Sequence, residues 1–273
     1  MTRSTTTPPD AAASAQDAGH HEGYDYEAGS PHLVNPQLRW RMVDAIRAVV
    51  GERLDATGQA RVLEIGAGHG AFTDHVLATG AAVTVTEMSR ASADLLRTRY
   101  AHNPRARVIF DETGDAPELA GEQFDVVLCM SVLHHIPDYL AAISAWLPAI
   151  APGGSFLSFQ DPLYYPRRSK LNLRVDRGAY YAWRVMHGDL IEGFKSFRRR
   201  AQKAYDESNH RDMVEYHVLR DGVDEQAIVE LLRPHFADVS LTTYWSTQSR
   251  TLQRVGDRFD LPTTFGVQAS GKR

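Results

Sequence analysis

The chain has 273 residues, of which 43% are hydrophobic and 23% are charged, with a formal net charge of −4 at pH 7. These values indicate a globular protein with a sizeable core, and they argue against a disordered chain or a nucleic-acid-binding protein. The single cysteine excludes an internal disulfide framework, and no Cys/His cluster suggests a metal site. No apolar run reaches the roughly 18 residues that a membrane span needs. We therefore expect a cytoplasmic protein that binds no metal, membrane or nucleic acid.

The N-terminal part of the sequence divides into two segments. Residues 1–22 are mostly Thr, Ala, Ser and Pro, which bury too little apolar surface to become ordered, so we expect a disordered tail. Residues 23–58 are predicted to form a helical lid. Its main helix begins at Pro36, and its apolar side chains recur at helical spacing (Leu38, Met42, Ile46 and Val49). We expect Gly51 to end this helix.

From residue 61 to residue 160 the sequence alternates between short apolar runs and amphipathic stretches. The expected strands are 61–65, 82–86, 107–110, 124–130 and 155–160, and the expected helices are 71–79, 89–100 and 139–150. The turn Pro152-Gly153-Gly154 is expected to precede the fifth strand. The continuous apolar run at 124–130 is typical of a strand that is covered on both faces. This alternation predicts a parallel, doubly wound sheet.

The alternation stops after the fifth strand and resumes later. Residues 162–222 are rich in aromatic residues and arginine and are expected to form a helical cap over the substrate. A helix at 224–232 and strands at 237–244 and 264–269 then complete the pattern. We therefore predict an α/β fold with a seven-stranded, mostly parallel, Rossmann-like sheet. Its core is expected to consist of residues 59–161 and 223–273.

The sequence VLEIGAGHG at 62–70 predicts a strand, a glycine-rich turn and the start of a helix. Such a turn lets a ligand approach the backbone closely. Glu64 precedes the turn, and a carboxylate there favours a ligand with a cationic amino group, such as S-adenosylmethionine, over a pyrophosphate. However, Gly66, Gly68 and Ala71 also match the dinucleotide fingerprint, with Glu87 placed about twenty residues further on. Both cofactors remain open on this motif alone.

Four segments taken in order resemble the class I S-adenosylmethionine-dependent methyltransferases. They are VLEIGAGHG, the acid Glu87 after the second strand, FDVVLCMSVLHHI at 124–136, and the step from helix through PGG to strand at 152–160. The resemblance implies S-adenosyl-L-methionine as the cofactor and a last strand that runs against the others. It favours a methyltransferase over a nicotinamide-dependent oxidoreductase, for which we find no Tyr/Lys or His/Asp catalytic pair.

The resemblance also implies roles for individual residues. The glycine turn is expected to hold the methionine part of the cofactor, with Glu64 facing its amino group, while Glu87 accepts the two ribose hydroxyls. The adenine amino group is expected to meet Asp111, with Glu112 and Asp115 as alternatives. The full set of expected cofactor-binding residues is Tyr24, Tyr26, Glu64, Gly66, Ala67, Gly68, Gly70, Glu87, Met88, Asp111, Glu112, Met130, Ser131 and His135.

Methyl transfer requires that the acceptor atom, the methyl carbon and the sulfur be held in line. A general base is also needed where the acceptor is a hydroxyl group or an activated carbon. The candidate bases are His134, His135, Glu215, Tyr216 and His217.

Aromatic residues of the predicted cap suggest the kind of acceptor. An aromatic lining suits a hydrophobic aromatic or terpenoid small molecule. The members are Tyr164, Tyr165, Tyr180, Tyr181, Trp183, Phe194 and Phe197. The predicted function is O- or C-methylation of such a molecule in bacterial secondary metabolism. The alternatives are an NAD(P)-dependent oxidoreductase and an S-adenosylmethionine-binding scaffold or cyclase without methyl transfer. The N-terminal segment is expected to cover the cofactor or to swap between the subunits of a homo-oligomer.

Overall fold

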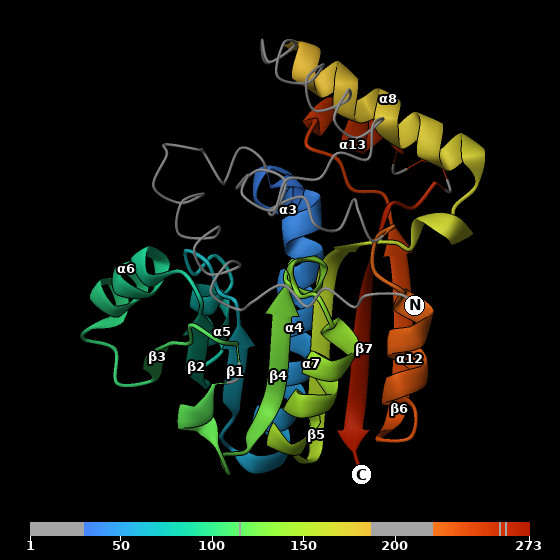
Figure 1. The fold of residues 1–273 in the computed structure, drawn as a ribbon. Coiled ribbons are helices and arrows are strands. Elements are labelled where there is room, and N and C mark those ends of the chain that lie inside the picture. The colour runs from blue at the N-terminus through green and yellow to red at the C-terminus, as the bar shows by residue number, and fades with distance from the viewer. Residues whose placement is uncertain (1–29, 115, 187–220, 257, 260) are drawn as a thin grey trace, which may run out of the picture.

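The computed structural model describes residues 30–273 except 115, 187–220, 257 and 260 (Figure 1). Seven strands form one sheet in the order β3-β2-β1-β4-β5-β7-β6, and β7 runs antiparallel to both of its neighbours. The strands are β1 (Arg61–Ile65), β2 (Ala82–Glu87), β3 (Ala106–Phe110), β4 (Phe124–Met130), β5 (Ile150–Pro162), β6 (Phe236–Tyr244) and β7 (Thr264–Lys272). The predicted Rossmann-like sheet with a reversed last strand is confirmed.

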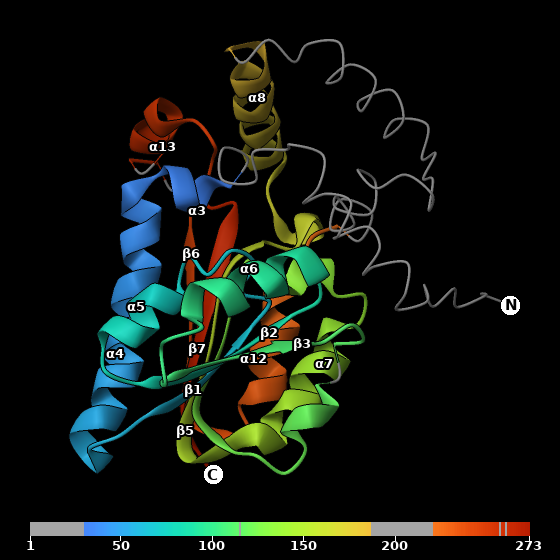
Figure 2. The ribbon, with the colours of Figure 1, turned by 90° about the vertical axis from the view of Figure 1, so that its left-hand side faces the viewer.

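Helices cover both faces of the sheet (Figures 1 and 2). One face carries α4 (Pro36–Thr57), α5 (Thr73–Ala78) and α6 (Arg90–Tyr100), and the other carries α7 (Tyr139–Trp146) and α12 (Glu225–Leu232). Above the carboxyl ends of the parallel strands lie α3 (Pro31–Val34), α8 (Lys170–Met186) and α13 (Arg250–Gly256). Short 3-10 helices are η1 (Pro117–Leu119), η2 (Leu133–His135), η3 (Leu147–Ala149) and η4 (Tyr165–Arg167). No helix in the described ranges is long and apolar enough to span a membrane.

The central strand β4 shows why the sheet is covered on both faces. Successive side chains of a strand point to opposite sides, so a strand that is apolar at every position feeds two cores. Val126 and Leu128 are buried in the core beneath α4, whereas Val127 and Cys129 are buried in the core beneath α7 and α12. The apolar run therefore places β4 at the centre of the sheet, between β1 and β5.

The long helix α4 differs from its predicted end. Gly51 lies inside the helix, which continues to Thr57 and is capped by Gly58 in the left-handed conformation (φ 74°). A glycine inside a helix costs only about 0.5–1 kcal/mol relative to alanine, so the burial of Val50 and the packing of Leu54 on the sheet outweigh it. Most of the predicted lid therefore packs on the sheet, and the division into tail, lid, core and cap stays a prediction.

Two other predicted helices are shorter in the structure. The turn that contains the glycines extends to Phe72, so α5 begins at Thr73 rather than at residue 71. The second was expected to reach residue 150, but α7 ends at Trp146 and is followed by η3. Pro148 explains this end, because proline lacks the amide hydrogen and its ring blocks the helical path.

Strand β5 begins earlier than predicted. Ile150 already pairs with Phe124, so the Pro-Gly-Gly sequence lies within the strand rather than in a turn before it. The pairing register shifts between Phe124 and Val126, which makes this sequence an irregularity in the strand. Further along the chain, α13 was not predicted, because its sequence is largely polar. Of the predicted cap, the structure describes η4 and α8, and residues 187–220 lie outside the described part.

Candidate active site

The glycine turn lies at the carboxyl end of β1, where open α/β sheets bind their ligands. The Gly66 amide donates a hydrogen bond of 2.9 Å to the carbonyl of Thr86, which fixes the turn against β2. Gly66 faces Val132, since a Cβ there would lie 2.9 Å from a methyl group of that residue. At Gly68 (φ 56°), by contrast, a Cβ would meet nothing within 4 Å. The turn is therefore closed at Gly66 and open at Gly68.

Glu87 ends β2 beside this turn. Its Oε2 accepts a hydrogen bond of 2.7 Å from the Gly68 amide, and its Oε1 accepts one of 2.9 Å from the Ser89 amide. The residue is only 7% exposed, and burial raises the pKa of its carboxyl group while these hydrogen bonds oppose the shift. An acidic group is thus held at the open side of the turn. Its role toward ribose stays a prediction.

Glu64 lies within β1 and is almost fully buried. Its Oε2 accepts a hydrogen bond of 2.7 Å from the Thr73 hydroxyl, which links β1 to α5. Burial raises the pKa of this carboxyl group to about 7. A cation bound beside it would favour the charged form, so the site is electrostatically suited to an amino group. The hydrogen bond from Thr73 also gives Glu64 a structural role, because it ties β1 to α5.

The acids after β3 differ in exposure. Asp111 is buried, and its Oδ1 accepts a hydrogen bond of 3.0 Å from the Gly114 amide, whereas Glu112 is exposed. Asp115 lies outside the described residues. Burial therefore favours Asp111 over Glu112 as a ligand contact. Among the other predicted cofactor contacts, Met130 is buried at the end of β4, Ser131 follows it with φ 63°, and Ala67 and Met88 are half-buried.

His134, which follows β4, and Asp161, near the end of β5, form a pair at the carboxyl edge of the sheet. The Nδ1 atom of His134 lies 2.8 Å from Oδ1 of Asp161, and the backbone amide of His134 donates to the same oxygen at 3.0 Å. The other oxygen accepts a bond of 3.1 Å from the Ser158 hydroxyl. The side chain of Asp161 is 0% exposed, and that of His134 is 11% exposed. The oxygens of an ionised Asp161 can only accept hydrogen bonds, so in that state Nδ1 of His134 carries the ring proton.

Burial sets the charge state of this pair. It lowers the pKa of His134 to about 3 and raises the pKa of Asp161 to about 7. The imidazole is therefore neutral near pH 7, with Nδ1 within hydrogen-bond distance of Asp161. Asp161 was missed in the sequence, although it follows the apolar run of the fifth strand as Asp111 follows that of the third. The expectation that the chain contains no His/Asp pair was therefore wrong.

The other candidate bases lie either beside His134 or outside the described residues. The rings of His134 and His135 lie 3.9 Å apart between centroids, so both histidines occupy the same region. Three further candidate bases and two predicted cofactor contacts lie outside the described residues. These five are Tyr24, Tyr26, Glu215, Tyr216 and His217.

His32 is a second residue that the sequence did not reveal. It is buried in α3, and its ring stacks on Phe72 at 5.8 Å between centroids. Burial and the nearby charge of Arg39 lower its pKa to about 4. Its Nδ1 atom is buried and has no hydrogen-bond partner among the described residues. Because Phe72 follows the glycine turn, α3 brings an unsatisfied polar atom to this region.

S-adenosylmethionine fits these features. The open side of Gly68 leaves room that a side chain would fill, and the carboxyl groups of Glu64 and Glu87 suit its amino and hydroxyl groups. The unsatisfied Nδ1 of His32 offers a further polar contact. Among the described residues, no group of three or more His, Cys, Asp or Glu side chains could hold a metal ion.

Comparisons with known proteins find methyltransferases. Residues 63–156 match the model of a family described as a methyltransferase domain. The ubiquinone biosynthesis O-methyltransferase of Xanthomonas oryzae pv. oryzae (strain PXO99A) is 37% identical over 129 residues, which are 45% of this chain and 52% of that protein. Its counterpart in Xanthomonas campestris pv. campestris (strain B100) is 36% identical over 132 residues, covering 46% and 50%. The chain thus spans about half the length of the curated relatives it matches.

Solved structures share the fold at low sequence identity. The N-methyltransferase NodS from Bradyrhizobium japonicum WM9, in complex with S-adenosyl-L-homocysteine, has a TM-score of 0.55 at 14% identity and covers 96% of this chain and 100% of that one. The plantazolicin methyltransferase BpumL, also in complex with S-adenosylhomocysteine, has a TM-score of 0.55 at 12% identity, covering 97% and 96%. These likenesses support the architecture.

Proposed function

We propose that this chain is a class I S-adenosylmethionine-dependent methyltransferase that methylates an oxygen or carbon atom of a hydrophobic small molecule. The observation that carries the proposal is the buried pair of His134 and Asp161 at the carboxyl edge of the sheet. A base at this edge is needed for an acceptor that must lose a proton. The named relatives are O-methyltransferases, which fits such an acceptor.

The cofactor would be held by the glycine turn and the acids around it. In the proposed arrangement Gly68 admits the cofactor to the backbone, Glu64 meets its amino group, Glu87 its ribose and Asp111 its adenine. When bound, S-adenosylmethionine supplies a methyl carbon that is electrophilic because the sulfur carries a positive charge. The protein then needs to align the acceptor and exclude water.

His134 is proposed to accept the acceptor's proton on Nε2. Asp161 holds the Nδ1–H and so fixes the ring orientation and the tautomer. It also stabilises the positive charge that the ring gains when Nε2 is protonated. Ser158 and the His134 amide hold Asp161 in place. General-base catalysis contributes roughly 10²–10⁴-fold to a rate, and the lowered pKa of His134 places its contribution at the lower end of this range.

The predicted cap indicates the kind of acceptor. Aromatic side chains lie in the described part of the predicted cap, where Tyr180 and Trp183 stack at 6.4 Å between ring centroids on α8. Such side chains suit an aromatic or terpenoid acceptor, and bacterial secondary metabolism remains the proposed context. A homo-oligomer formed through the N-terminal segment and a cytoplasmic location also stay proposals.

Calorimetric titration with S-adenosylhomocysteine, with NADH alongside, tests the function. We expect S-adenosylhomocysteine to bind and NADH not to bind. Glu87→Ala should weaken the binding at least tenfold, whereas Glu118→Ala, which changes an exposed glutamate in η1, should leave it unchanged. Binding of NADH alone would replace the proposal with an oxidoreductase. Binding of S-adenosylhomocysteine without methyl transfer in a screen of aromatic and terpenoid acceptors would indicate a scaffold or cyclase.

A further inference from the structure

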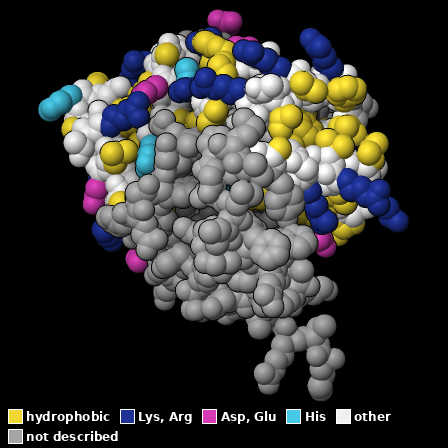
Figure 3. All heavy atoms as spheres, turned by 90° about the horizontal axis from the view of Figure 1, so that it is seen from above, with side chains coloured by type: hydrophobic (Ala, Val, Ile, Leu, Met, Phe, Trp, Pro, Cys, Tyr) yellow, Lys and Arg dark blue, Asp and Glu magenta, His cyan; other side chains and the backbone are white. Residues whose placement is uncertain are grey.

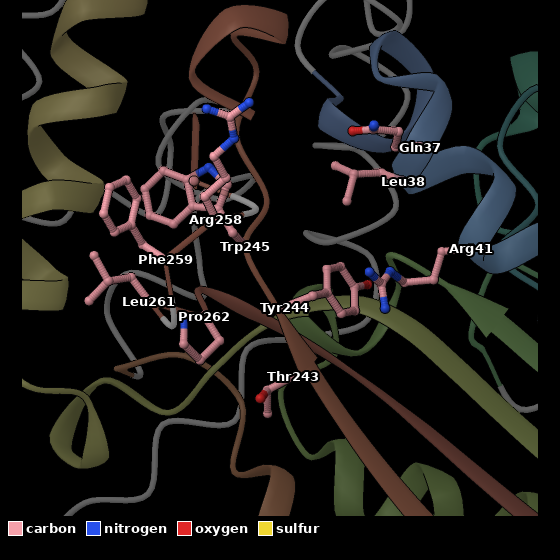
Figure 4. A pocket seen from close by; sticks show the side chains of 11 residues that line it. Gln37, Leu38, Arg41, Thr243, Tyr244, Trp245, Arg258, Phe259, Leu261 and Pro262 are labelled. Atoms are coloured by element: carbon pink, nitrogen blue, oxygen red, sulfur yellow. The ribbon is translucent and has the colours of Figure 1, made fainter. Parts of the chain in front are cut away.

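A cavity of about 610 Å³ lies at the carboxyl edge of the sheet, away from the glycine turn (Figure 4). It opens between the start of α4, the end of β6 and the segment after α13. Its size falls within the range of small-molecule sites. The described residues that line it are Gln37, Leu38, Arg41, Thr243, Tyr244, Trp245, Gly256, Arg258, Phe259, Leu261 and Pro262.

The cavity combines apolar walls with two arginines. Trp245 and Phe259 lie on one side with Arg258, and Arg41 lies on the other side over the ring of Tyr244 (Figure 4). The Cζ atom of Arg41 is 4.8 Å from that ring centroid, so the stacking orients its guanidinium. In the view onto this edge, basic side chains likewise lie beside apolar ones on the described surface (Figure 3).

No acid balances these charges within the described part of the chain. The lining contains no Asp or Glu among the described residues, and neither Arg41 nor Arg258 forms an ion pair with a described carboxylate. A planar guanidinium that is held by stacking recognises a carboxylate through two parallel hydrogen bonds. The described lining thus combines two guanidinium groups with aromatic walls, while Asp257 and Asp260, the sequence neighbours of Arg258 and Phe259, lie outside the described residues.

Trp245 supplies an independent sign of a missing contact. It is 5% exposed, and its Nε1 atom is buried without a hydrogen-bond partner among the described residues. Gly256 packs directly on this ring, since a Cβ there would lie 2.3 Å from Nε1. Buried indole N–H groups normally have a partner, so an unsatisfied one on a cavity wall points to a polar ligand atom.

The cavity is connected to the proposed base. The Tyr244 hydroxyl accepts a hydrogen bond of 3.0 Å from the backbone amide of Gln160. It donates one of 3.3 Å to the side-chain Oε1 atom of the same residue. Gln160 directly precedes Asp161, which holds His134. One wall of the cavity and the base are therefore fixed by adjacent residues of β5.

We infer that this cavity binds the acceptor, and that the acceptor is an aromatic carboxylate held by Arg41 and Arg258. The inference rests on the proposed function, because an acceptor is required only if the chain transfers methyl groups. The aromatic body would lie against Trp245 and Phe259, and the carboxylate would lie between the two arginines. The reacting group would then extend toward His134.

The test compares two probes that differ only in charge. The full chain is titrated by calorimetry with 2-naphthoate and with 2-naphthalenemethanol, as wild type and as Arg41→Gln/Arg258→Gln. The matched control is Arg47→Gln/Arg254→Gln, which removes exposed arginines of α4 and α13 that do not line the cavity. S-adenosylhomocysteine affinity is measured in every variant.

We expect the wild type and the control to bind 2-naphthoate roughly tenfold or more tightly than the alcohol. Arg41→Gln/Arg258→Gln should lose that preference and keep its affinity for S-adenosylhomocysteine. Equal binding of both probes by the wild type, no binding of either, or a preference that survives in Arg41→Gln/Arg258→Gln would each overturn the inference. If the wild type also fails to bind S-adenosylhomocysteine, it is the proposed function that fails.

Discussion

The imidazole of His134 and the carboxylate of Asp161 are brought together by the parallel pairing of β4 and β5. Met130, the last residue of β4, pairs with Phe159, and the chain continues from these two residues into the histidine turn and the aspartate respectively. The resulting contact joins residues that are 27 positions apart in the sequence. The geometry of the proposed base is thus a property of the sheet, and it should persist when either side chain is changed conservatively.

Replacing His134 separates base catalysis from cofactor binding. His134→Ala should lower kcat by roughly 10²–10⁴-fold with an acceptor that the wild type methylates, since Nε2 is the proposed proton acceptor. Asp161→Asn should also lower kcat, because an amide no longer favours the Nδ1–H tautomer. Affinity for S-adenosylhomocysteine should remain. Exposed His102 provides the control His102→Ala, which should keep full activity. An unchanged kcat in His134→Ala would exclude this base.

The pH dependence of stability should contain a contribution from Glu64. Burial raises its pKa from 4.5 to about 7, so the folded state holds the proton more tightly than the unfolded state. This contribution to the free energy of unfolding is present below about pH 4.5 and is lost as the pH rises through 7. From the shift in pKa its size is on the order of 3 kcal/mol. Glu64→Gln removes this dependence while keeping an acceptor for Thr73.

Urea unfolding at pH 5 and pH 8 measures this effect. The free energy of unfolding of Glu64→Gln relative to the wild type should rise between the two pH values. The same comparison for Glu118→Gln should show no such change, since that glutamate is exposed. A difference between Glu64→Gln and wild type that does not vary with pH would show that Glu64 stays ionised in the folded protein.

Two glycines should respond in opposite directions to alanine. A Cβ at Gly51 meets nothing within 4 Å in the middle of α4, so Gly51→Ala should stabilise the protein by about 0.5–1 kcal/mol. A Cβ at Gly256 would lie 2.3 Å from the ring of Trp245, so Gly256→Ala should destabilise it by about 1–3 kcal/mol. Urea midpoints and tryptophan emission report both changes. Equal effects of the two substitutions would contradict the packing of α13 on Trp245.

The thiol of Cys129 should be unreactive in the folded protein. It lies near the carboxyl end of β4 with no exposed surface, and burial raises the pKa of its thiol. The thiolate is the reactive form, so Ellman's reagent should react slowly under native conditions. In guanidinium chloride one thiol per chain should react at once, as the sequence contains one cysteine. Rapid reaction of the native protein would mean that β4 opens readily.

The strands could be predicted well because their signal is local. The apolar runs at β1 and β4 give the observed bounds to the residue, since a strand that is covered on both faces needs apolar side chains at nearly every position. The ends of helices were harder, because they depend on what packs beyond them. Gly51 shows this, as tertiary contacts of the following turns carry α4 past it.

The site could be predicted only where the motif is contiguous. The glycine turn and the acids after β2 and β3 follow strand ends that the sequence marks. Asp161 and His32 depend on contacts between distant segments, and no spacing in the sequence indicates that Asp161 meets His134 or that His32 lies on Phe72. The cavity beside Trp245 depends equally on α13, whose polar sequence carries no clear helical pattern.

The reversed strand β7 affects when the sheet can be completed during synthesis. In the described part of the chain β6 pairs only with β7, and β7 is inserted between β5 and β6. β6 therefore leaves the ribosome before its only neighbour exists, and β5 keeps an open edge for the same time. The part of the sheet from β3 to β5 can form earlier from local, parallel units. The two open edges would then be the surfaces most exposed to wrong pairing until residue 272 has emerged.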